Sequence, residues 1–242
     1  RFKLQAHRGI SHKYPENTLV SFKAASTAPC FWGIETDVQE TSDGKIVVFH
    51  DEKLDDKTNG NGLIADYTFE YLDKNIFYNN NVNGLEQYPK ERIPLFEEYL
   101  DICIDKQKVP YIELKHLSSS GIDTILGLLK AKKLNGKCVF SSFNWEYIEY
   151  LRGKSNEYPI EFMLRDKIYN AENIIKKLLT LPDIYFRPRV STLTKDIVNA
   201  FNSAGVLVEG YGLAVGDNET LQNLKKWNVH GATCNDYEDL SL

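Results

Sequence analysis

Carboxylates recur at a two-residue spacing in two short segments of the chain. Glu35 and Asp37 flank Thr36, and Glu113 precedes Lys115 by two positions. In a β-strand, side chains at positions i and i+2 lie on the same face. If the two faces converge, Glu35, Asp37 and Glu113 form a group of three carboxylates, which is costly to bury unless a cation joins it. An all-oxygen ligand set favours Mg²⁺ or Ca²⁺ over zinc.

Two histidines are the candidate acid and base of such a site. His7 is followed directly by Arg8, and His50 follows a short apolar segment. Imidazole titrates near neutral pH and suits the proton transfers of phosphoester cleavage. Arg8 and Lys115 supply positive charge for the non-bridging oxygens of a phosphate. The residue types therefore predict metal-assisted cleavage of a phosphodiester, with His7 and His50 as catalytic residues.

Each of these features also has an ordinary structural explanation. An acidic residue in a strand commonly belongs to a solvated face, and a histidine beside an arginine is commonly structural. Convergence indicates a site, because one fold has to bring all of these residues to the same end. His12, His116 and His230 are interpreted as surface or structural residues.

Strand and helix patterns alternate along most of the chain. Helical segments carry apolar residues at spacings of three and four, as in Ile122, Ile125 and Leu129. Strand-helix repetition predicts a parallel sheet, and eight strands predict a closed (β/α)₈ TIM barrel with its chemistry at the carboxyl ends of the strands. The length of 242 residues fits one such domain, spanning residues 1–242. The predicted strands are Phe2–Ala6, Gly33–Val38, Val109–Lys115, Cys138–Ser141, Ile160–Leu164, Ile184–Arg187, Val206–Glu209 and Gly231–Cys234.

A further short strand at Lys45–Phe49 breaks the alternation. Only four residues separate it from the second strand, which is too few for a parallel crossover but enough for a β-hairpin. A turn centred on Ser42-Asp43 would pair Asp37 with Val48 and fold His50 back over the carboxylates. A slip of one residue would turn the side chains to the other face.

Residues from about 51 to 92 differ in composition from the rest of the chain. They include Asn59-Gly60-Asn61-Gly62 and Asn79-Asn80-Asn81, with scattered aromatic residues between. We interpret them as a small insertion after the second barrel strand that forms a rim loop near the active site.

Composition excludes several classes of protein. A formal net charge of -5 argues against a nucleic-acid-binding protein, which needs a basic face. No apolar run approaches the ~20 residues of a membrane span, so no stable membrane insertion is expected. The four cysteines include no C-x-x-C pair, which disfavours a zinc site or a dense disulfide framework. Scattered thiols favour a reducing compartment, so a cytoplasmic location is expected, although a removed signal peptide would make a secreted or periplasmic location possible.

Short motifs follow one another in a specific order over nearly the whole chain: His7-Arg8-Gly9, Pro15-Glu16-Asn17-Thr18, Glu35-x-Asp37-Val38, Thr41-x-Asp43-Gly44, Val47-Val48-x-His50-Asp51, Glu113-Leu114-Lys115, Ser142-Phe143 and Gly231-Ala232-Thr233-Cys234-Asn235-Asp236. This order resembles the signature of the glycerophosphodiester phosphodiesterase family, within the phospholipase-C-like phosphodiesterase superfamily.

The resemblance implies metal-dependent hydrolysis of glycerophosphodiesters to glycerol 3-phosphate and an alcohol. It implies that His7 and His50 are the acid-base pair, that the three carboxylates hold a divalent metal ion, and that Arg8 and Lys115 contact the phosphate. Glu16 is expected to brace the first loop and to orient His7. The nucleophile is either water or the substrate's own glycerol hydroxyl, acting through a cyclic phosphate.

Two positions depart from the family pattern and leave the substrate open. Asp56 stands where an arginine is usual, and residues 206–212 replace a strand that usually ends in Trp-Thr-Val-Asn. One alternative is a phosphodiesterase of lysophospholipids or sphingolipids, which would need a broad apolar patch at the rim. Another is a barrel that binds phosphodiesters without turning them over. The expected partner is a small-molecule substrate, and the oligomeric state is not readable from the sequence.

Overall fold

A computed structural model describes all residues, 1–242, and contains the predicted barrel. The strands lie in the order β7-β6-β5-β4-β2-β1-β9-β8, and every neighbouring pair of this order is parallel. Isolated parallel bridges, Phe186 to Val208 and Arg189 to Tyr211, join β7 to β8 and complete the ring. The prediction of a (β/α)₈ barrel is confirmed. Its strands are β1 (Lys3–His7), β2 (Phe31–Glu40), β4 (Val109–His116), β5 (Val139–Ser142), β6 (Ile160–Leu164), β7 (Ile184–Pro188), β8 (Glu209–Leu213) and β9 (Gly231–Cys234).

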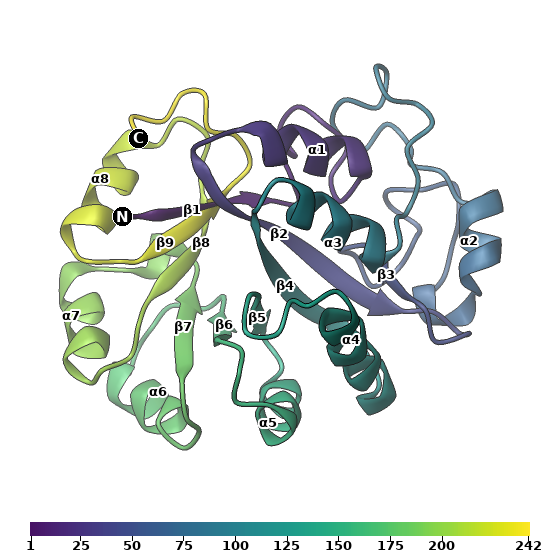
Figure 1. Cartoon of the computed structure of the whole chain (residues 1–242). Helices are drawn as coiled ribbons and strands as arrows, with labels where there is room; N and C mark the ends of the chain where they lie inside the picture. The colour runs from purple at the N-terminus through teal and green to yellow at the C-terminus, as the bar shows by residue number, and fades with distance from the viewer.

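Helices alternate with these strands and lie around the outside of the barrel (Figure 1). Each buries an apolar face: α4, for example, buries Ile122, Ile125 and Leu129, as its periodicity predicts. Thr18 caps the first helix, because its hydroxyl accepts a hydrogen bond from the amide of Ser21. The barrel helices are α1 (Leu19–Thr27), α3 (Phe96–Asp105), α4 (Ser119–Ala131), α5 (Trp145–Lys154), α6 (Ala171–Leu178), α7 (Lys195–Ser203) and α8 (Asn218–Lys226). No helix has both the length and the apolar character needed to cross a membrane.

The predicted hairpin is present, but its predicted register is wrong by one residue. β3 (Ile46–Val48) runs antiparallel to β2, and Val48 pairs with Val38 rather than with Asp37. The turn holds three residues instead of two, because the amide of Thr41 donates to the carbonyl oxygen of Lys45. Gly44 closes the turn at a φ of 73°, a left-handed conformation that glycine adopts at little cost.

The seventh barrel strand, β8, begins later than predicted. Residues 206 and 207 are irregular, Val208 forms only an isolated bridge, and β8 extends through the glycines to Leu213. The register against β9 shifts between Gly210 and Leu213. Glycine weakens the strand pattern in a sequence, so the continuation into these residues was not predicted.

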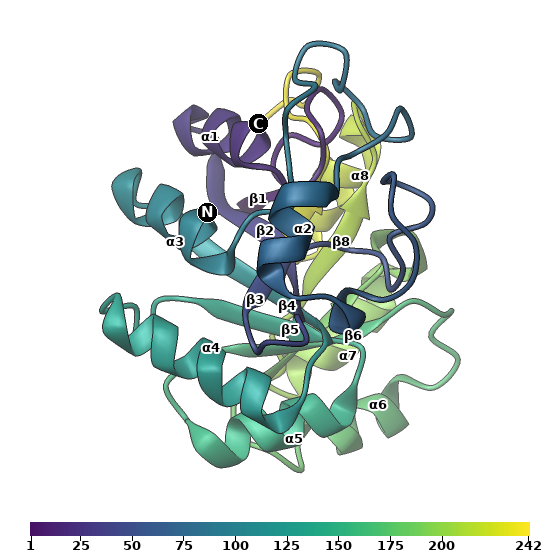
Figure 2. The same cartoon turned by 90° about the vertical axis from the view of Figure 1, so that its right-hand side faces the viewer.

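Residues between β3 and α3 form the segment predicted as an insertion. It contains the 3₁₀ turn η1 (Ile64–Asp66) and the helix α2 (Phe69–Asn75), which lies in front of the barrel strands in Figure 2. The segment has a separate apolar cluster of nine buried residues, beside a barrel core of 45. β3 contributes to both: Ile46 and Val48 belong to the barrel core, whereas Val47 belongs to the cluster of the insertion.

Candidate active site

Parallel register brings the predicted carboxylates together at the carboxyl ends of neighbouring strands. Asp37 of β2 is level with Glu113 of β4, and His7 of β1 is level with Glu35 of β2. One oxygen from each of Glu35, Asp37 and Glu113 lies within 4.8 Å of the others, and all three residues are buried. We call these three residues the acidic triad.

The acidic triad is electrostatically unfavourable by itself. Burial, together with Asp37 and Glu113, raises the pKa of Glu35 well above its usual value. Burial and the charge of Asp37 raise the pKa of Glu113 to about 7. Burial also opposes ionisation of Asp37, but Arg8 and the other cations around it outweigh that effect and lower its pKa. Two of the three buried carboxyl groups have raised pKa values, and the third stays ionised because cations lie beside it. A bound cation would therefore stabilise this site.

Unsatisfied oxygens support the same conclusion. Asp37 Oδ1 and Glu113 Oε1 are buried and have no hydrogen-bond partner. Lys115 Nζ lies 3.8 Å from the first and 2.5 Å from the second, so a cation already faces both oxygens. Buried, crowded carboxylate oxygens with free lone pairs are the donors that a hard divalent cation takes, so the residues fit a divalent metal ion.

His7 lies at the end of β1, next to the acidic triad. Its Nδ1 is 2.6 Å from Oδ1 of Asn235, and its Nε2 is 3.9 Å from Oε2 of Glu35. Because an amide oxygen only accepts, Nδ1 carries the proton and Nε2 keeps its lone pair. Burial and the nearby Arg8 lower the pKa of His7 to about 3, so the ring is neutral at physiological pH. Asn235 was part of the terminal motif but was assigned no role from the sequence.

His50 is held by the residues after β3. Its Nδ1 donates to Oδ1 of Asp51 at 2.7 Å, and Lys57 Nζ contacts the same oxygen at 3.1 Å. Gln39 fixes the backbone on both sides, because its amide donates to the carbonyl oxygens of Phe49 and Asp51. Burial lowers the pKa of His50, and the charges of Arg8 and Lys115 lower it further. The charge of Asp37 raises the pKa but does not outweigh these effects. His50 lines the same cavity as His7 and the acidic triad members Glu35 and Glu113.

Arg8 connects the first loop to the acidic triad. Its backbone φ is 58°, its Nε lies 3.3 Å from Asp37 Oδ2, and its amide donates to Glu35 Oε2 at 3.1 Å. Glu16 accepts from Arg8 Nη1 at 2.9 Å and pairs with Lys57 at 3.0 Å. Glu16 therefore braces the loop as expected, but it contacts Arg8 and Lys57 rather than His7.

Gly9 makes this loop possible. Its φ is 80°, and a Cβ at this position would lie 2.1 Å from the hydroxyl oxygen of Ser21. A side chain would push the loop away from α1 and displace the neighbouring Arg8. The third position of the H-R-G motif thus requires glycine, because of its backbone conformation and the close approach of Ser21.

A cavity of about 200 Å³ opens above the acidic triad, and only three of its thirteen lining residues are apolar. Three of its cations were not predicted from the sequence: Arg165, Arg187 and Arg189. All three lie at or just beyond the carboxyl ends of β6 and β7, which in a barrel is the end that carries chemistry. That position was the available signal. His12, His116 and His230 do not line this cavity.

Arg187 leads from the cavity into a buried ionic cluster inside the barrel. Its guanidinium lies 3.1 Å from Glu161 and 3.6 Å from Glu209, and it donates to Gln5 Oε1 at 2.9 Å. Burial raises the pKa of Glu161, and the charge of Arg187 opposes that rise. We call Gln5, Glu161, Arg187 and Glu209 the internal ionic cluster.

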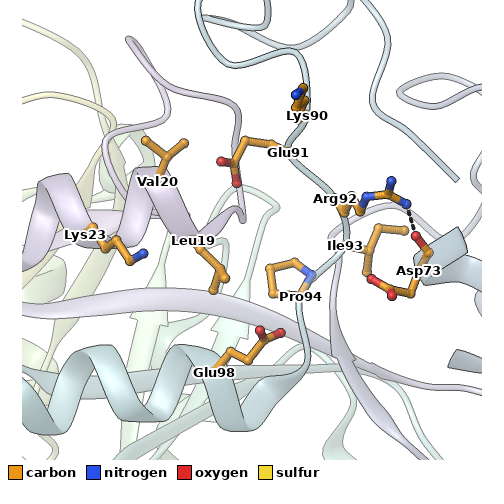
Figure 3. Close-up of a pocket in the computed structure, with 10 residues that line it drawn as sticks. All are labelled: Leu19, Val20, Lys23, Asp73, Lys90, Glu91, Arg92, Ile93, Pro94 and Glu98. Carbon is orange, nitrogen blue, oxygen red and sulfur yellow. Dashed lines mark hydrogen bonds between the residues drawn. The ribbon is translucent and has the colours of Figure 1, made fainter. Parts of the chain in front are cut away.

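A larger cavity of about 430 Å³ lies elsewhere, where α1 and the start of α3 meet residues 90–94 of the insertion (Figure 3). Its charged residues are balanced, with three basic and three acidic side chains, and none belongs to the acidic triad. The guanidinium of Arg92 donates to the backbone carbonyl oxygen of Asp73 in α2. This hydrogen bond ties residues 90–94 to α2. We interpret this cavity as a seam between the insertion and the barrel helices.

Comparisons with known proteins agree with this geometry. The model of the Glycerophosphoryl diester phosphodiesterase family matches residues 7–239. A glycerophosphodiester phosphodiesterase of Bacillus altitudinis is 28% identical over 235 residues, covering 95% of this chain and 92% of the relative. One of Bacillus subtilis is 30% identical over 250 residues, covering 97% of this chain and 83% of the relative.

A similar solved structure is an Oleispira antarctica phosphodiesterase in complex with the product sn-glycerol-3-phosphate. It has a TM-score of 0.84 and 24% identity, over 96% of this chain and 92% of the other. The likeness establishes the shared barrel fold.

Proposed function

Because this chain belongs to the glycerophosphoryl diester phosphodiesterase family, we propose that it is a metal-dependent hydrolase that converts glycerophosphodiesters to glycerol 3-phosphate and an alcohol. One observation carries the proposal: His7, His50, Arg8 and Lys115 line a single cavity next to the acidic triad. The two Bacillus relatives match nearly the full chain, and both are named glycerophosphodiester phosphodiesterases, which supports the same substrate class.

Glu35, Asp37 and Glu113 would hold the divalent ion, Mg²⁺ or Ca²⁺, which supplies charge that polarises the phosphoryl group when bound. Arg8 and Lys115 would contact the non-bridging oxygens, because both line the cavity and already face carboxylates of the acidic triad. These contacts orient the phosphorus for attack and offset the charge that grows on its oxygens.

The partners of the two histidines favour different roles. His7 is held by the neutral amide of Asn235 and presents an unprotonated Nε2, which suits the base that takes the proton of the nucleophile. His50 is held by the carboxylate of Asp51, which stabilises an imidazolium, so it suits the acid that protonates the leaving alkoxide. The nucleophile is water or the glycerol hydroxyl of the substrate.

The first experiment measures turnover of glycerophosphocholine by the purified protein before and after chelation, and after addition of Mg²⁺ or Ca²⁺. Activity that disappears with chelation and returns with one ion supports the proposal and identifies the ion. Phosphorus NMR of the same reaction distinguishes the routes, because an early cyclic phosphate excludes direct attack by water. No turnover of any small glycerophosphodiester by the metal-loaded protein would overturn the proposal.

The structure gives little support to the lipid alternative. The cavity is mainly polar, because only three of its thirteen lining residues are apolar. A lipid substrate needs a contiguous apolar surface for its chains. Binding of the protein to phospholipid vesicles, measured by sedimentation, is expected to be weak.

A further inference from the structure

The cavity carries more positive charge than the proposed reaction uses. Of its three additional arginines, Arg187 is neutralised by the two glutamates of the internal ionic cluster. Arg165 and Arg189 are exposed, and neither has a carboxylate oxygen within 4.0 Å. Both side chains nevertheless line the cavity beside His7 and Lys115.

A charge count shows that these two arginines are surplus. Five carboxylates, those of the acidic triad, Glu16 and Asp51, face the three cations Arg8, Lys57 and Lys115 and the expected divalent ion. Five negative charges therefore meet five positive charges before substrate enters. A phosphodiester brings a single negative charge. At least one of Arg165 and Arg189 would therefore stay unmatched with such a substrate in place.

The surplus charge is continuous with the proposed phosphate site. Lys115 Nζ lies 5.5 Å from the centroid of the Phe143 ring, and Arg165 Cζ lies 5.4 Å from the same centroid. Tyr211 meets this ring edge-on at 5.9 Å, and a backbone bridge places Tyr211 next to Arg189. The Phe143 ring thus lies between the expected phosphate contact Lys115 and the surplus arginines.

Tyr211 adds an independent observation. Its hydroxyl oxygen is buried and has no hydrogen-bond partner, although the residue lines the cavity. A buried hydroxyl without a partner is costly unless a ligand completes it. The hydroxyl and the two guanidinium groups are all hydrogen-bond donors, which is the composition that binds a phosphate group.

We propose that Arg165, Arg189 and Tyr211 form a second anion subsite, and that the preferred substrate is a glycerophosphodiester whose alcohol carries a further phosphate group. The inference rests on the proposed function and specifies the class of its substrate. The scissile phosphate would lie at the acidic triad and Lys115, and the second phosphate at the rim beyond Phe143.

The test compares two substrates that differ only in this group: glycerophosphoglycerol, and the same diester with a phosphate monoester on the terminal hydroxyl of the leaving glycerol. The metal-loaded protein is expected to favour the phosphorylated substrate in kcat/KM by about 10-fold or more at low ionic strength. Added salt should reduce this preference, because the arginines are exposed.

The variant Arg165→Gln/Arg189→Gln should lower the ratio of the two kcat/KM values by about 10-fold. Lys167→Gln is the control, since it removes one charge from the exposed loop that carries Arg165, but Lys167 does not line the cavity. The control should preserve the ratio.

The outcomes separate this inference from the proposed function. Turnover of glycerophosphoglycerol without preference for the phosphorylated substrate overturns the second subsite and leaves the proposed function standing. An equal loss on both substrates in the double variant also overturns it, because the arginines would then contact the shared half. Turnover of neither substrate by the unaltered protein overturns the proposed function itself.

Discussion

His50 Nδ1 donates to Asp51 Oδ1 at 2.7 Å, and this contact leaves Nε2 as the ring atom available to a substrate. Asp51→Asn removes the charge that favours the imidazolium, while keeping the size of the side chain. We expect kcat to fall about 10- to 100-fold with little change in KM. Because the hydrogen bond to Asp51 raises the pKa of His50, the pKa assigned to His50 in the pH profile should move lower.

Asp105→Asn, on the exposed end of α3, is the control for Asp51→Asn and should keep wild-type kinetics. If Asp51→Asn instead raises KM by about 10- to 100-fold and leaves kcat unchanged, the positioning role is contradicted. Such a result would show that Asp51 contributes only to substrate binding.

The two histidines should be essential to turnover and dispensable for metal binding. His7→Ala and His50→Ala are each expected to lower kcat about 10²- to 10⁴-fold, the usual range for a general acid or base. Steady-state kinetics measures the loss, and titration calorimetry with Mg²⁺ or Ca²⁺ checks that the ion still binds. His12→Ala changes an exposed histidine outside the cavity and should be indistinguishable from the unaltered protein. Unchanged turnover in either alanine variant would show that the altered histidine is not the acid or base of the reaction.

Metal affinity should depend on pH through the acidic triad. Without metal, the pKa of Glu113 is raised to about 7, so below that pH a proton competes with the ion for the carboxylate. The association constant should rise about 10-fold for each pH unit as the pH increases towards 7, where the contribution of Glu113 levels off. The raised pKa of Glu35 acts in the same direction and steepens the dependence.

Calorimetry between pH 5 and pH 8 measures this dependence. Glu113→Gln should bind the ion more weakly and with a shallower slope, whereas Glu172→Gln, on the surface of α6, should reproduce the unaltered protein. An affinity that does not vary with pH would show that these carboxylates are not the ligands.

The internal ionic cluster should make Arg187 important for stability. Arg187→Met leaves Glu161 and Glu209 buried without their main cation, and removal of one partner from a buried ion pair costs about 3–5 kcal/mol. Urea unfolding at pH 8 measures the change, with Lys195→Met as an exposed control. The loss should shrink at pH 5, because burial already raises the pKa of Glu161 and the variant lacks the arginine that opposes protonation. A loss below about 1 kcal/mol at pH 8 would mean that the cluster is not a stabilising pair.

The positions of the acidic triad were predictable because strand periodicity is a local property. Glu35 and Asp37 share a face by their spacing, and the parallel register of β2 and β4 brings Glu113 level with Asp37. The (β/α)₈ barrel followed from the number and alternation of strands. The catalytic and ligand roles of these residues stay predictions, which the variants above test.

The hairpin register was not predictable by the same reasoning. Turns of two and three residues both suit the sequence around Asp43-Gly44, and the choice depends on the hydrogen bond of Thr41 with Lys45. The arginines of the cavity were missed for a different reason. A charged residue after a strand is usually solvated, and only the closure of the barrel brings Arg165, Arg187 and Arg189 to one opening.

The double-sided packing of β3 has a consequence for how the protein loses activity. Val47 and Phe49 pack in the cluster of the insertion, whereas Ile46 and Val48 pack in the barrel, so His50 is anchored where two separately packed units meet. Units with separate cores can open independently below the global melting temperature. Heat should therefore release His50 first and inactivate a protein that still retains its metal ion. The same separation lets evolution remodel the insertion beyond Lys57 without rebuilding the acidic triad.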